Sequence, residues 1–295
     1  MSGPYQIVEV QSNWRIAVEE MGSKEKFWYR NPETDTDWLF KFPQDNTGQH
    51  WAEKIAAEVA SRLGTPHAKV NLAEFQGTRG SVTESFARGG RELVHGNQML
   101  ERIVHGYDSQ KKFRQSAHTL SNIWQVMDRF FVEPESAGRA KLRTAEYLVL
   151  DALIGNTDRH HENWGLLRKR AGDHWRGFVA PSFDHASSLG RELLDARRDR
   201  HLTENRVGEY AEKGRGAIYW SEEERRGPSP LELVRRGTGK HPELFRPALV
   251  KLEKLDNDNL RGLVNRVPDD WMTPSAREFA IALLCYNFDR LGELI

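Results

Sequence analysis

The densest group of polar side chains in this chain of 295 residues lies between two apolar segments, in the sequence IGNTDRHHENWGLL at residues 154–167. Residues 156–163 comprise two asparagines, an aspartate, an arginine, two histidines, a glutamate and a threonine. Asp184 follows in the sequence PSFDHASSLG. Three interpretations suit such a cluster: a transition-metal site, a site of phosphoryl transfer, or a solvated turn.

A transition-metal site needs three or four histidine, cysteine or carboxylate ligands at suitable spacing. His160 and His161 are adjacent, so a regular backbone points their side chains in different directions. The other histidines nearby in sequence are His174 and His185. The pattern therefore disfavours a zinc site.

Phosphoryl transfer uses the residues of this cluster differently. It needs a carboxylate that orients the attacking hydroxyl, and oxygen ligands that hold Mg²⁺ against the phosphates. Asp158 and Asn163 lie five residues apart, and Asp184 follows a segment that we expect to form a short strand, GFVAPSF. We predict Asp158 as the catalytic carboxylate, with Asn163 and Asp184 as the ligands of Mg²⁺. A solvated turn remains the alternative at this point.

Lys41 stands between two phenylalanines in WLFKFP, a segment typical of a strand. A lysine in a buried strand needs a partner, and the following helix offers Glu53 and Glu58. The alternative is a lysine on an edge strand that reaches water. Gly22, in EEMGSKEK, would let backbone N–H groups approach phosphates, although hairpins also use single glycines.

The surrounding elements divide the chain into two parts. Strand-like segments fill the first 42 residues, and HWAEKIAAEVASRLG (50–64) is predicted to form a helix that Gly64 ends. Two further strands are expected before residue 87, and mostly helices after residue 95. The sequence therefore predicts an α+β fold with a β-rich lobe over 1–87 and a helical lobe over 88–295.

Composition narrows the classes of function. The chain has 43 basic and 43 acidic residues, and a net charge of zero disfavours wrapping by nucleic acid. Its one cysteine, Cys285, lies in an apolar segment and favours a core role in a reducing compartment. No apolar segment approaches the ~20 residues of a membrane helix, and we find no signal peptide. We expect a cytoplasmic protein without membrane or direct nucleic-acid contacts.

The motifs, taken in order, resemble those of the HipA-like serine/threonine kinases, the toxin kinases of bacterial toxin–antitoxin systems. The similarity runs from about residue 19 to residue 190 and more loosely to the C-terminus. The matching segments are GSKEK for the phosphate loop, LFKF for the lysine strand, WAEKIAAEVASRLG for the following helix, VTESFARG for the hinge, NTDRHHENWGLL for the catalytic loop and APSFDHASSL for the metal loop.

This resemblance implies a bilobal protein-kinase-like fold, ATP and Mg²⁺ as cofactors, and transfer to a protein serine or threonine. It also implies roles for individual residues, with a helix register that favours Glu53 over Glu58. The catalytic residues would be Asp158, Lys41 and Glu53; the ATP-binding residues would be Gly22, Ser23, Lys26, Lys41, Glu84, Ser85, Phe86 and His160; the metal ligands would be Asn163 and Asp184.

Three departures from the family pattern affect these expectations. Longer members carry an additional N-terminal subdomain, so we expect the compact kinase-core form. Glu19 stands where the family often has an autophosphorylated serine, and Ser23 follows the loop glycine instead. DRHHEN also resembles the catalytic loop of phosphoinositide kinases, which keeps a lipid or small-molecule kinase as the alternative.

The resemblance leaves the substrate protein unknown and implies an antitoxin protein as a partner. A third interpretation is a nucleotide-binding pseudokinase that regulates another protein. The intact set of Lys41, Asp158, Asn163 and Asp184 disfavours it, because loss of catalysis usually removes one of these residues.

Overall fold

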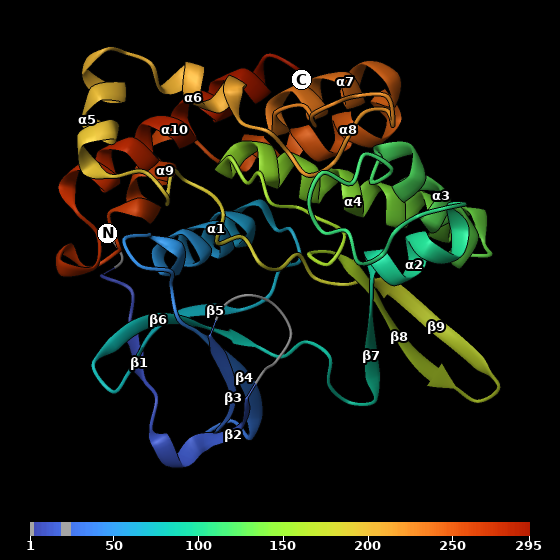
Figure 1. Ribbon diagram of the computed structural model, residues 1–295, viewed down its shortest axis with the longest axis horizontal. Helices are drawn as coiled ribbons and strands as arrows, with labels where there is room; N and C mark the ends of the chain where they lie inside the picture. Colours follow the sequence, from blue (N-terminus) through green and yellow to red (C-terminus); the bar gives the residue numbers. More distant parts are fainter. Residues whose placement is uncertain (1–2, 19–24) are drawn as a thin grey trace.

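A computed structural model describes residues 3–18 and 25–295 of the chain. Figure 1 shows a body of helices lying on one side of a six-stranded sheet, with a smaller sheet beside it. Strands and helices are thus largely segregated, as the α+β prediction requires. The expected boundary at residue 87 falls in the segment between the two sheets and stays a prediction.

The larger sheet has the strand order β1-β5-β6-β4-β3-β2. Its neighbours pair antiparallel, except for the parallel pair β1 and β5. Its strands are β1 (Ile7–Glu9), β2 (Arg15–Val18), β3 (Lys26–Asn31), β4 (Thr36–Lys41), β5 (Val70–Phe75) and β6 (Thr78–Glu84). The strand-like segments predicted before residue 87 therefore meet in one sheet.

One face of this sheet carries an aromatic core. Phe27 and Phe40 stack at 5.1 Å between ring centroids, and Phe75 packs on Phe27 at 4.7 Å. Side chains alternate between the two faces of a strand. Since Phe40 points into this aromatic core, its neighbour Lys41 points to the opposite face, toward the helices.

Helix α1 (Gln49–Leu63) lies between the large sheet and the other helices, and it contacts β5, β6, α4 and α9. Contacts on both sides explain why nearly all of its side chains are buried, including the carboxylate of Glu53. Gly64 ends the helix in the left-handed conformation, with φ of +67°, and its N–H donates to the carbonyl of Ala60. This is the helix that the sequence predicted over 50–64.

The remaining chain forms nine further helices and a three-stranded sheet within the described residues. The sheet has the order β7-β8-β9 and is antiparallel. Its strands are β7 (Arg91–His95), β8 (Gly165–Ala171) and β9 (His174–Val179). The helices are α2 (Gly96–Ile103), α3 (Leu120–Phe130), α4 (Pro134–Ile154), α5 (Asp195–Thr203), α6 (Val207–Lys213), α7 (Pro230–Lys240), α8 (Pro242–Leu249), α9 (Asn257–Val264) and α10 (Pro274–Gly292).

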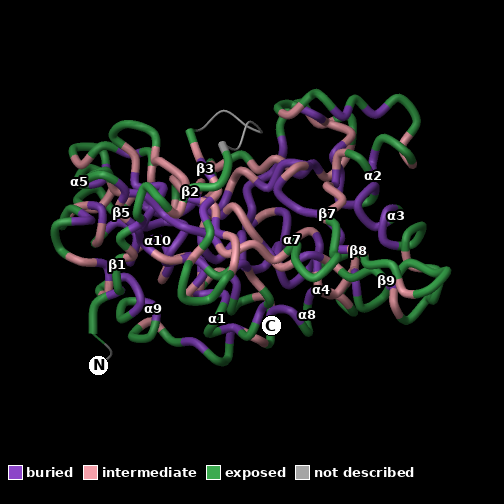
Figure 2. Tube along the Cα trace, turned by 90° about the horizontal axis from the view of Figure 1, so that it is seen from below, coloured by how far each residue is buried: buried purple, intermediate pink, exposed green. Residues whose placement is uncertain are grey.

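Helices α4 and α10 form the centre of the main core, where most of the chain is buried (Figure 2). In the C-terminal helix α10, Phe279, Leu283 and Leu284 are fully buried. The β8–β9 hairpin is much more exposed at its far end (Figure 2). No helix in the described ranges is long and apolar enough to cross a membrane.

Three element boundaries differ from the prediction. β7 was not expected, because its partner β8 lies about seventy residues further along the chain. The helical segment FRQSAHTLSNIWQVMDRFF (113–131) forms α3 only from Leu120, since Thr119 caps the helix and accepts from the N–H of Asn122. β9 ends at Val179, so Asp184 lies in a loop and not directly after a strand.

Candidate active site

Lys41 lies where the large sheet faces α1, and it contacts two carboxylates that are distant in sequence. Its Nζ lies 3.1 Å from Oδ1 of Asp184 and 3.9 Å from Oε2 of Glu53. Glu58, the other candidate partner, pairs instead with Lys54 at 2.6 Å. The structure therefore brings Lys41 together with Glu53 and Asp184, and not with Glu58.

Burial and charge act in opposite directions on this cluster. Burial lowers the pKa of Lys41, but Asp184 and Glu53 outweigh it and hold that pKa above its usual value. Burial raises the pKa of Glu53, and Lys41 and His185 reverse this and leave that pKa below its usual value. The lysine is thus held as a cation and Glu53 as an anion, in a region with little water.

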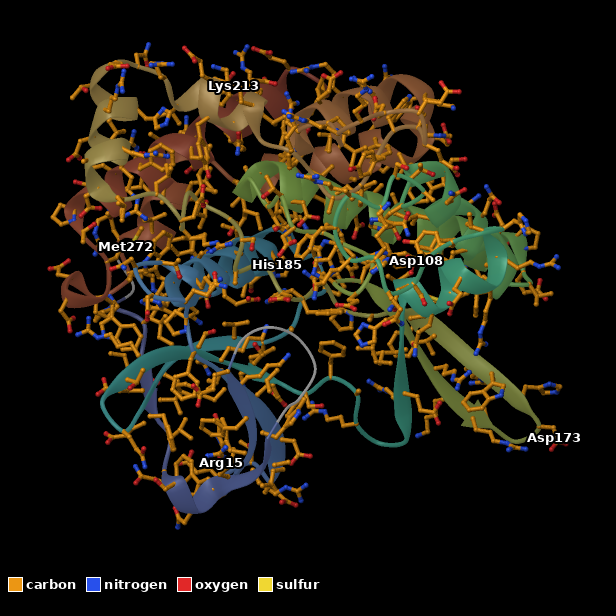
Figure 3. All side chains as sticks on the ribbon, viewed as in Figure 1. Arg15, Asp108, Asp173, His185, Lys213 and Met272 are labelled. Carbon is orange, nitrogen blue, oxygen red and sulfur yellow. The ribbon has the colours of Figure 1, made fainter. Side chains whose placement is uncertain are left out.

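Glu53 also ties α1 to the loop that carries Asp184. Its Oε1 accepts from the backbone N–H of His185 at 2.9 Å. Figure 3 shows His185 at the junction between the helices and the large sheet. Within the described residues, the other oxygen of Glu53 is buried without a hydrogen bond, which leaves its charge directed at Lys41.

The backbone of Asp184 adopts the left-handed conformation, with φ of +57°. This conformation is uncommon outside glycine and is tolerated best by aspartate and asparagine. It follows Phe183, whose ring packs against Phe86 at 5.3 Å and against His95 at 6.3 Å. Such a fixed, strained residue is typical of functional sites.

The expected hinge residues lie at the end of β6. Glu84 is the last residue of that strand, and its carboxylate pairs with Arg88 at 2.6 Å and Lys69 at 3.7 Å. The N–H of Ser85 donates to the carbonyl of Asp37 on β4. Phe86 follows and reaches the Asp184 loop through Phe183. The segment predicted to bind adenine therefore contacts β4 through Ser85 and the Asp184 loop through Phe86.

The catalytic loop follows α4, which Gly155 ends in the left-handed conformation. Asn163 donates from Nδ2 to the carbonyl of Asp158 at 2.8 Å, so these two residues close one turn. Its amide oxygen is then the atom with the chemistry to bind a hard cation. The Asp158 carboxylate accepts from Ser187 Oγ at 3.3 Å, and its side chain is 35% exposed.

Arg159 holds this loop in place, a role that the sequence analysis did not assign. The guanidinium is buried and donates to both carboxylate oxygens of Asp151, near the end of α4, at 2.7 and 2.6 Å. The Nη1 atom of Arg159 donates to two backbone carbonyls, those of Asn163 at 2.7 Å and Phe183 at 2.9 Å. The catalytic loop and the Asp184 loop are thus fixed to one side chain, which sets Asn163 beside Asp184.

His160 and His161 point in different directions, as their adjacency predicts. The Nδ1 of His161 forms a buried hydrogen bond with the hydroxyl of Tyr107, 2.8 Å away. The Nδ1 of His160 accepts from the N–H of Glu162, and its Nε2 lies 4.0 Å from Asp158. Burial, with Lys112 adding to it, lowers the pKa of His160 to about 4, so His160 is neutral at pH 7. Across residues 3–18 and 25–295 no group of three or more His, Cys, Asp or Glu side chains is arranged to hold a metal ion.

Of the remaining predicted residues, the structure describes only Lys26. Lys26 pairs with Lys41 in the register of β3 and β4, which places the two lysines on neighbouring strands. Gly22, Ser23 and Glu19 fall outside the residues that the structure describes. The predicted phosphate loop is therefore located only through Lys26 at its far end.

A cleft of about 910 Å³ opens beside Asp158. It lies between the catalytic loop, the segment before α1 and the segment 215–227. Asp158 thus stands at the wall of an open cleft, while Lys41 and Glu53 are more deeply buried.

Residues 16–225 match the family model of the HipA-like C-terminal domain. The chain belongs to this family. The matched range contains Lys41, Glu53, Asp158, Asn163 and Asp184, and it ends at the segment that closes the cleft. The family membership agrees with the resemblance found in the sequence motifs.

Individual relatives point in the same direction. The serine/threonine-protein kinase CtkA of Helicobacter pylori is 26% identical over 181 residues, which is 57% of this chain and 50% of that protein. The chain thus aligns with half the length of this curated relative. The chain is a HipA-like kinase homologue by these matches.

Solved structures confirm the fold. The crystal structure of the Helicobacter pylori proinflammatory kinase CtkA superposes with a TM-score of 0.76 at 18% identity, over 91% of this chain and 93% of that one. HipA of Shewanella oneidensis MR-1, solved with HipB and operator DNA, gives a TM-score of 0.63 at 15% identity. The match covers 97% of this chain and 68% of that one. The α+β fold is therefore that of the HipA-like kinases.

Proposed function

We propose that this protein is a Mg²⁺–ATP-dependent kinase that transfers the γ-phosphate to a serine or threonine hydroxyl of a protein. The observation that carries the proposal is the position of Lys41, a buried cation between Glu53 and Asp184 at 3.9 and 3.1 Å. A cation held in this way suits the phosphates of a nucleotide. The serine/threonine kinase activity named for CtkA supports the choice of substrate class.

The residues of the site fit a magnesium ion. The proposed ligands, Asn163 and Asp184, offer oxygen atoms, which Mg²⁺ prefers, and Arg159 holds their loops together. When bound, the ion would supply positive charge that neutralises the nucleotide phosphates. Lys41 would then contact the nucleotide phosphates, while Glu53 keeps its ammonium group in position.

Asp158 would orient the acceptor hydroxyl and take up its proton. Its carboxylate is partly exposed at the cleft and held by Ser187, so its charge reaches a substrate from a fixed position. His160, neutral at pH 7, would face the phosphates without adding charge. Gly22, Ser23 and Lys26 would cover the phosphates, and Glu84, Ser85 and Phe86 would hold the adenine.

Binding of nucleotide and metal is the first test. ATP should raise the melting temperature of the protein more strongly with Mg²⁺ than without it, because the ion joins the nucleotide to Asn163 and Asp184. Asp184→Ala should remove the Mg²⁺-dependent part of this shift, measured by scanning fluorimetry. A full Mg²⁺-dependent shift in Asp184→Ala would contradict the assignment.

The acceptor is the second test. Incubation with [γ-32P]ATP and a protein mixture should label serine or threonine, as phosphoamino-acid analysis would show. Label found only in lipid or small molecules would favour the alternative kinase class. ATP binding without any transfer would favour a pseudokinase.

The proposal includes a protein partner of the antitoxin type. The HipA of Shewanella oneidensis was solved together with HipB, which supports such a partner for a chain of the same fold. We expect direct nucleic-acid contacts to belong to the partner, because this chain has no net charge. Co-expression with a partner of this kind should suppress phosphate transfer, and unchanged transfer would contradict this part of the proposal.

A further inference from the structure

The cleft beside Asp158 is strongly basic, although the chain as a whole has no net charge. Two of its charged side chains are acidic, Asp158 and Glu192. Six are basic: Lys112, Arg114, Arg191, Arg215, Arg225 and Arg226. Positive charge is therefore concentrated where a substrate would approach the catalytic loop.

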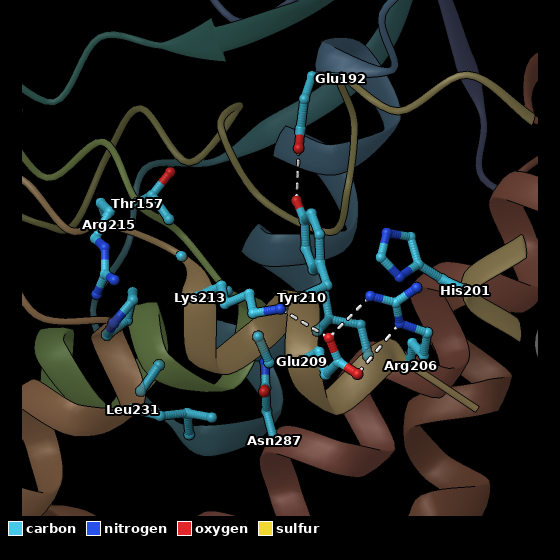
Figure 4. Close-up of a pocket in the computed structure, with 16 residues that line it drawn as sticks. Thr157, Glu192, His201, Arg206, Glu209, Tyr210, Lys213, Arg215, Leu231 and Asn287 are labelled. Carbon is cyan, nitrogen blue, oxygen red and sulfur yellow. Dashed lines mark hydrogen bonds and ion pairs between the residues drawn. The ribbon is translucent and has the colours of Figure 1, made fainter. Parts of the chain in front are cut away.

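Most of these arginines have no acidic partner among the residues that the structure describes. Among residues 3–18 and 25–295, none of Arg114, Arg215, Arg225 and Arg226 forms an ion pair, although all four are exposed. Arg206 and Lys213, next to and on α6, instead pair with Glu209 at 3.1 and 2.8 Å, and Figure 4 shows both pairs.

Two glycines bring the arginine-bearing segments together. A Cβ atom at Gly227 would overlap the carbonyl oxygen of Gly216, and one at Gly216 would lie 2.9 Å from the carbonyl of Pro228. The N–H of Gly216 donates to the same Pro228 carbonyl at 2.8 Å. This close approach of two backbones sets Arg215 beside Arg226 at the cleft.

Two of the three acidic residues in the turn between them anchor it. Glu222 accepts from Asn122 at 3.1 Å, and Glu224 pairs with Arg236 at 2.7 Å. The third, Glu223, is exposed, and none of the three lines the cleft. Arg225 and Arg226 are left facing solvent.

The floor of the cleft connects to the catalytic carboxylate. Arg191 donates from Nη2 to Ser187 Oγ at 3.1 Å, and Ser187 donates to Asp158 at 3.3 Å. The Nε of Arg191 is buried without a hydrogen-bond partner among the described residues. Glu192, the other acid, accepts from Tyr210 OH at 2.6 Å (Figure 4), and the six basic side chains outnumber it and Asp158.

We propose that this cleft binds an acidic segment of the substrate protein, so that the kinase selects a serine or threonine flanked by aspartate and glutamate. This inference rests on the proposed function. Guanidinium groups bind carboxylates through paired hydrogen bonds, and several of them along one cleft match an extended acidic chain. Phe113, 68% exposed at the cleft, offers an apolar contact to the same chain.

Peptide binding tests the inference separately from catalysis. Three fluorescent peptides would carry the same central serine with acidic, neutral or basic flanks, and their dissociation constants would be measured by anisotropy. We expect the acidic peptide to bind most tightly and its affinity to fall with added salt. Arg225→Glu/Arg226→Glu should weaken that binding at least about tenfold, since it replaces attraction by repulsion at two positions.

A matched control carries the same change in charge elsewhere. Arg197→Glu/Arg246→Glu alters two exposed arginines outside the cleft that pair with no acid in the described chain, and it should keep the affinity within about twofold. The melting temperature and the Mg²⁺-dependent shift with ATP would confirm that both double variants are folded. If Arg225→Glu/Arg226→Glu does not fold, Arg225→Ala/Arg226→Ala replaces it.

Equal binding of the three peptides, or equal losses in the two double variants, would overturn the inference. A single-stranded oligonucleotide that binds more tightly than the acidic peptide would also overturn it. Transfer of phosphate to neutral and acidic peptides alike would leave the proposed function standing and remove the selectivity. Selective binding of the acidic peptide without any phosphate transfer would keep the selectivity of the cleft and contradict the proposed function.

Discussion

Glu53→Gln removes one charge from the centre of the site and changes little else. The glutamine amide keeps the size of the side chain and an oxygen that can accept from the N–H of His185, as Oε1 does at 2.9 Å. What disappears is the negative charge whose Oε2 lies 3.9 Å from Lys41. The variant therefore isolates the contribution of the charge to the position of the lysine.

Distances in the cluster give the magnitude. At an effective dielectric constant of ~20, unit charges 3.9 Å apart attract by about 4 kcal/mol, and charges 3.1 Å apart by about 5 kcal/mol. Without Glu53, Lys41 keeps mainly Asp184, the proposed metal ligand. If a closer contact of Lys41 with Asp184 recovers half of the lost attraction, the remaining loss of about 2 kcal/mol corresponds to a roughly thirtyfold slower reaction.

The assay is the initial rate of ADP release in Mg²⁺–ATP with a serine-containing peptide. Glu58→Gln is the matched control, because Glu58 lies on the same helix and pairs with Lys54 and Arg266 away from the site. It should keep the rate within about twofold of the unaltered protein. Equal losses in the two variants, or full activity in Glu53→Gln, would refute the role of the pair.

Two further predictions concern the loops around the site. Arg159→Ala should lower the free energy of unfolding, measured by chemical denaturation, by about 3–5 kcal/mol, because it leaves Asp151 buried without its partner. Arg139→Ala, which removes an exposed ion pair, should change that free energy little. Similar losses in the two variants would contradict the role of Arg159. Burial lowers the pKa of His118 to about 3, so the unfolded chain binds the proton first as pH falls below 6.5. Stability should then fall by about 1.4 kcal/mol per pH unit through this group, and His118→Gln should reduce that slope between pH 6 and 4; an unchanged slope would exclude His118 as its source.

The strands, the first helix and the site motifs were predictable because their signals are local. β4 alternates buried and less buried residues around Lys41, and α1 has apolar residues at helical spacing up to Gly64. The pair of Asp158 and Asn163 closes one turn, so five residues of sequence carry its geometry. Their catalytic roles stay predictions until activity is measured.

Other parts of the site depend on contacts between distant segments. Arg159 lies within the polar cluster that the sequence analysis singled out, yet its partners come from α4 and from the loop of Phe183, and no spacing encodes them. β7 pairs with β8 across the helical segments α2–α4. The basic cleft collects a lysine and five arginines from segments spread between residues 112 and 226, in a chain whose total charge is zero. The positive charge of the cleft is therefore apparent only in the folded structure.

The central claim, that Asp158 serves the acceptor hydroxyl while other residues hold the nucleotide, is tested most directly by Asp158→Asn. The substitution keeps the shape of the side chain and removes its charge, so phosphate transfer should fall by roughly 10²–10⁴-fold while the affinity for Mg²⁺–ATP stays nearly unchanged. Glu162→Gln, at the other acid of the loop, whose carboxylate pairs with Lys112 at 2.7 Å, should keep transfer close to that of the unaltered protein. Full transfer by Asp158→Asn, or loss of transfer in Glu162→Gln alone, would contradict the account.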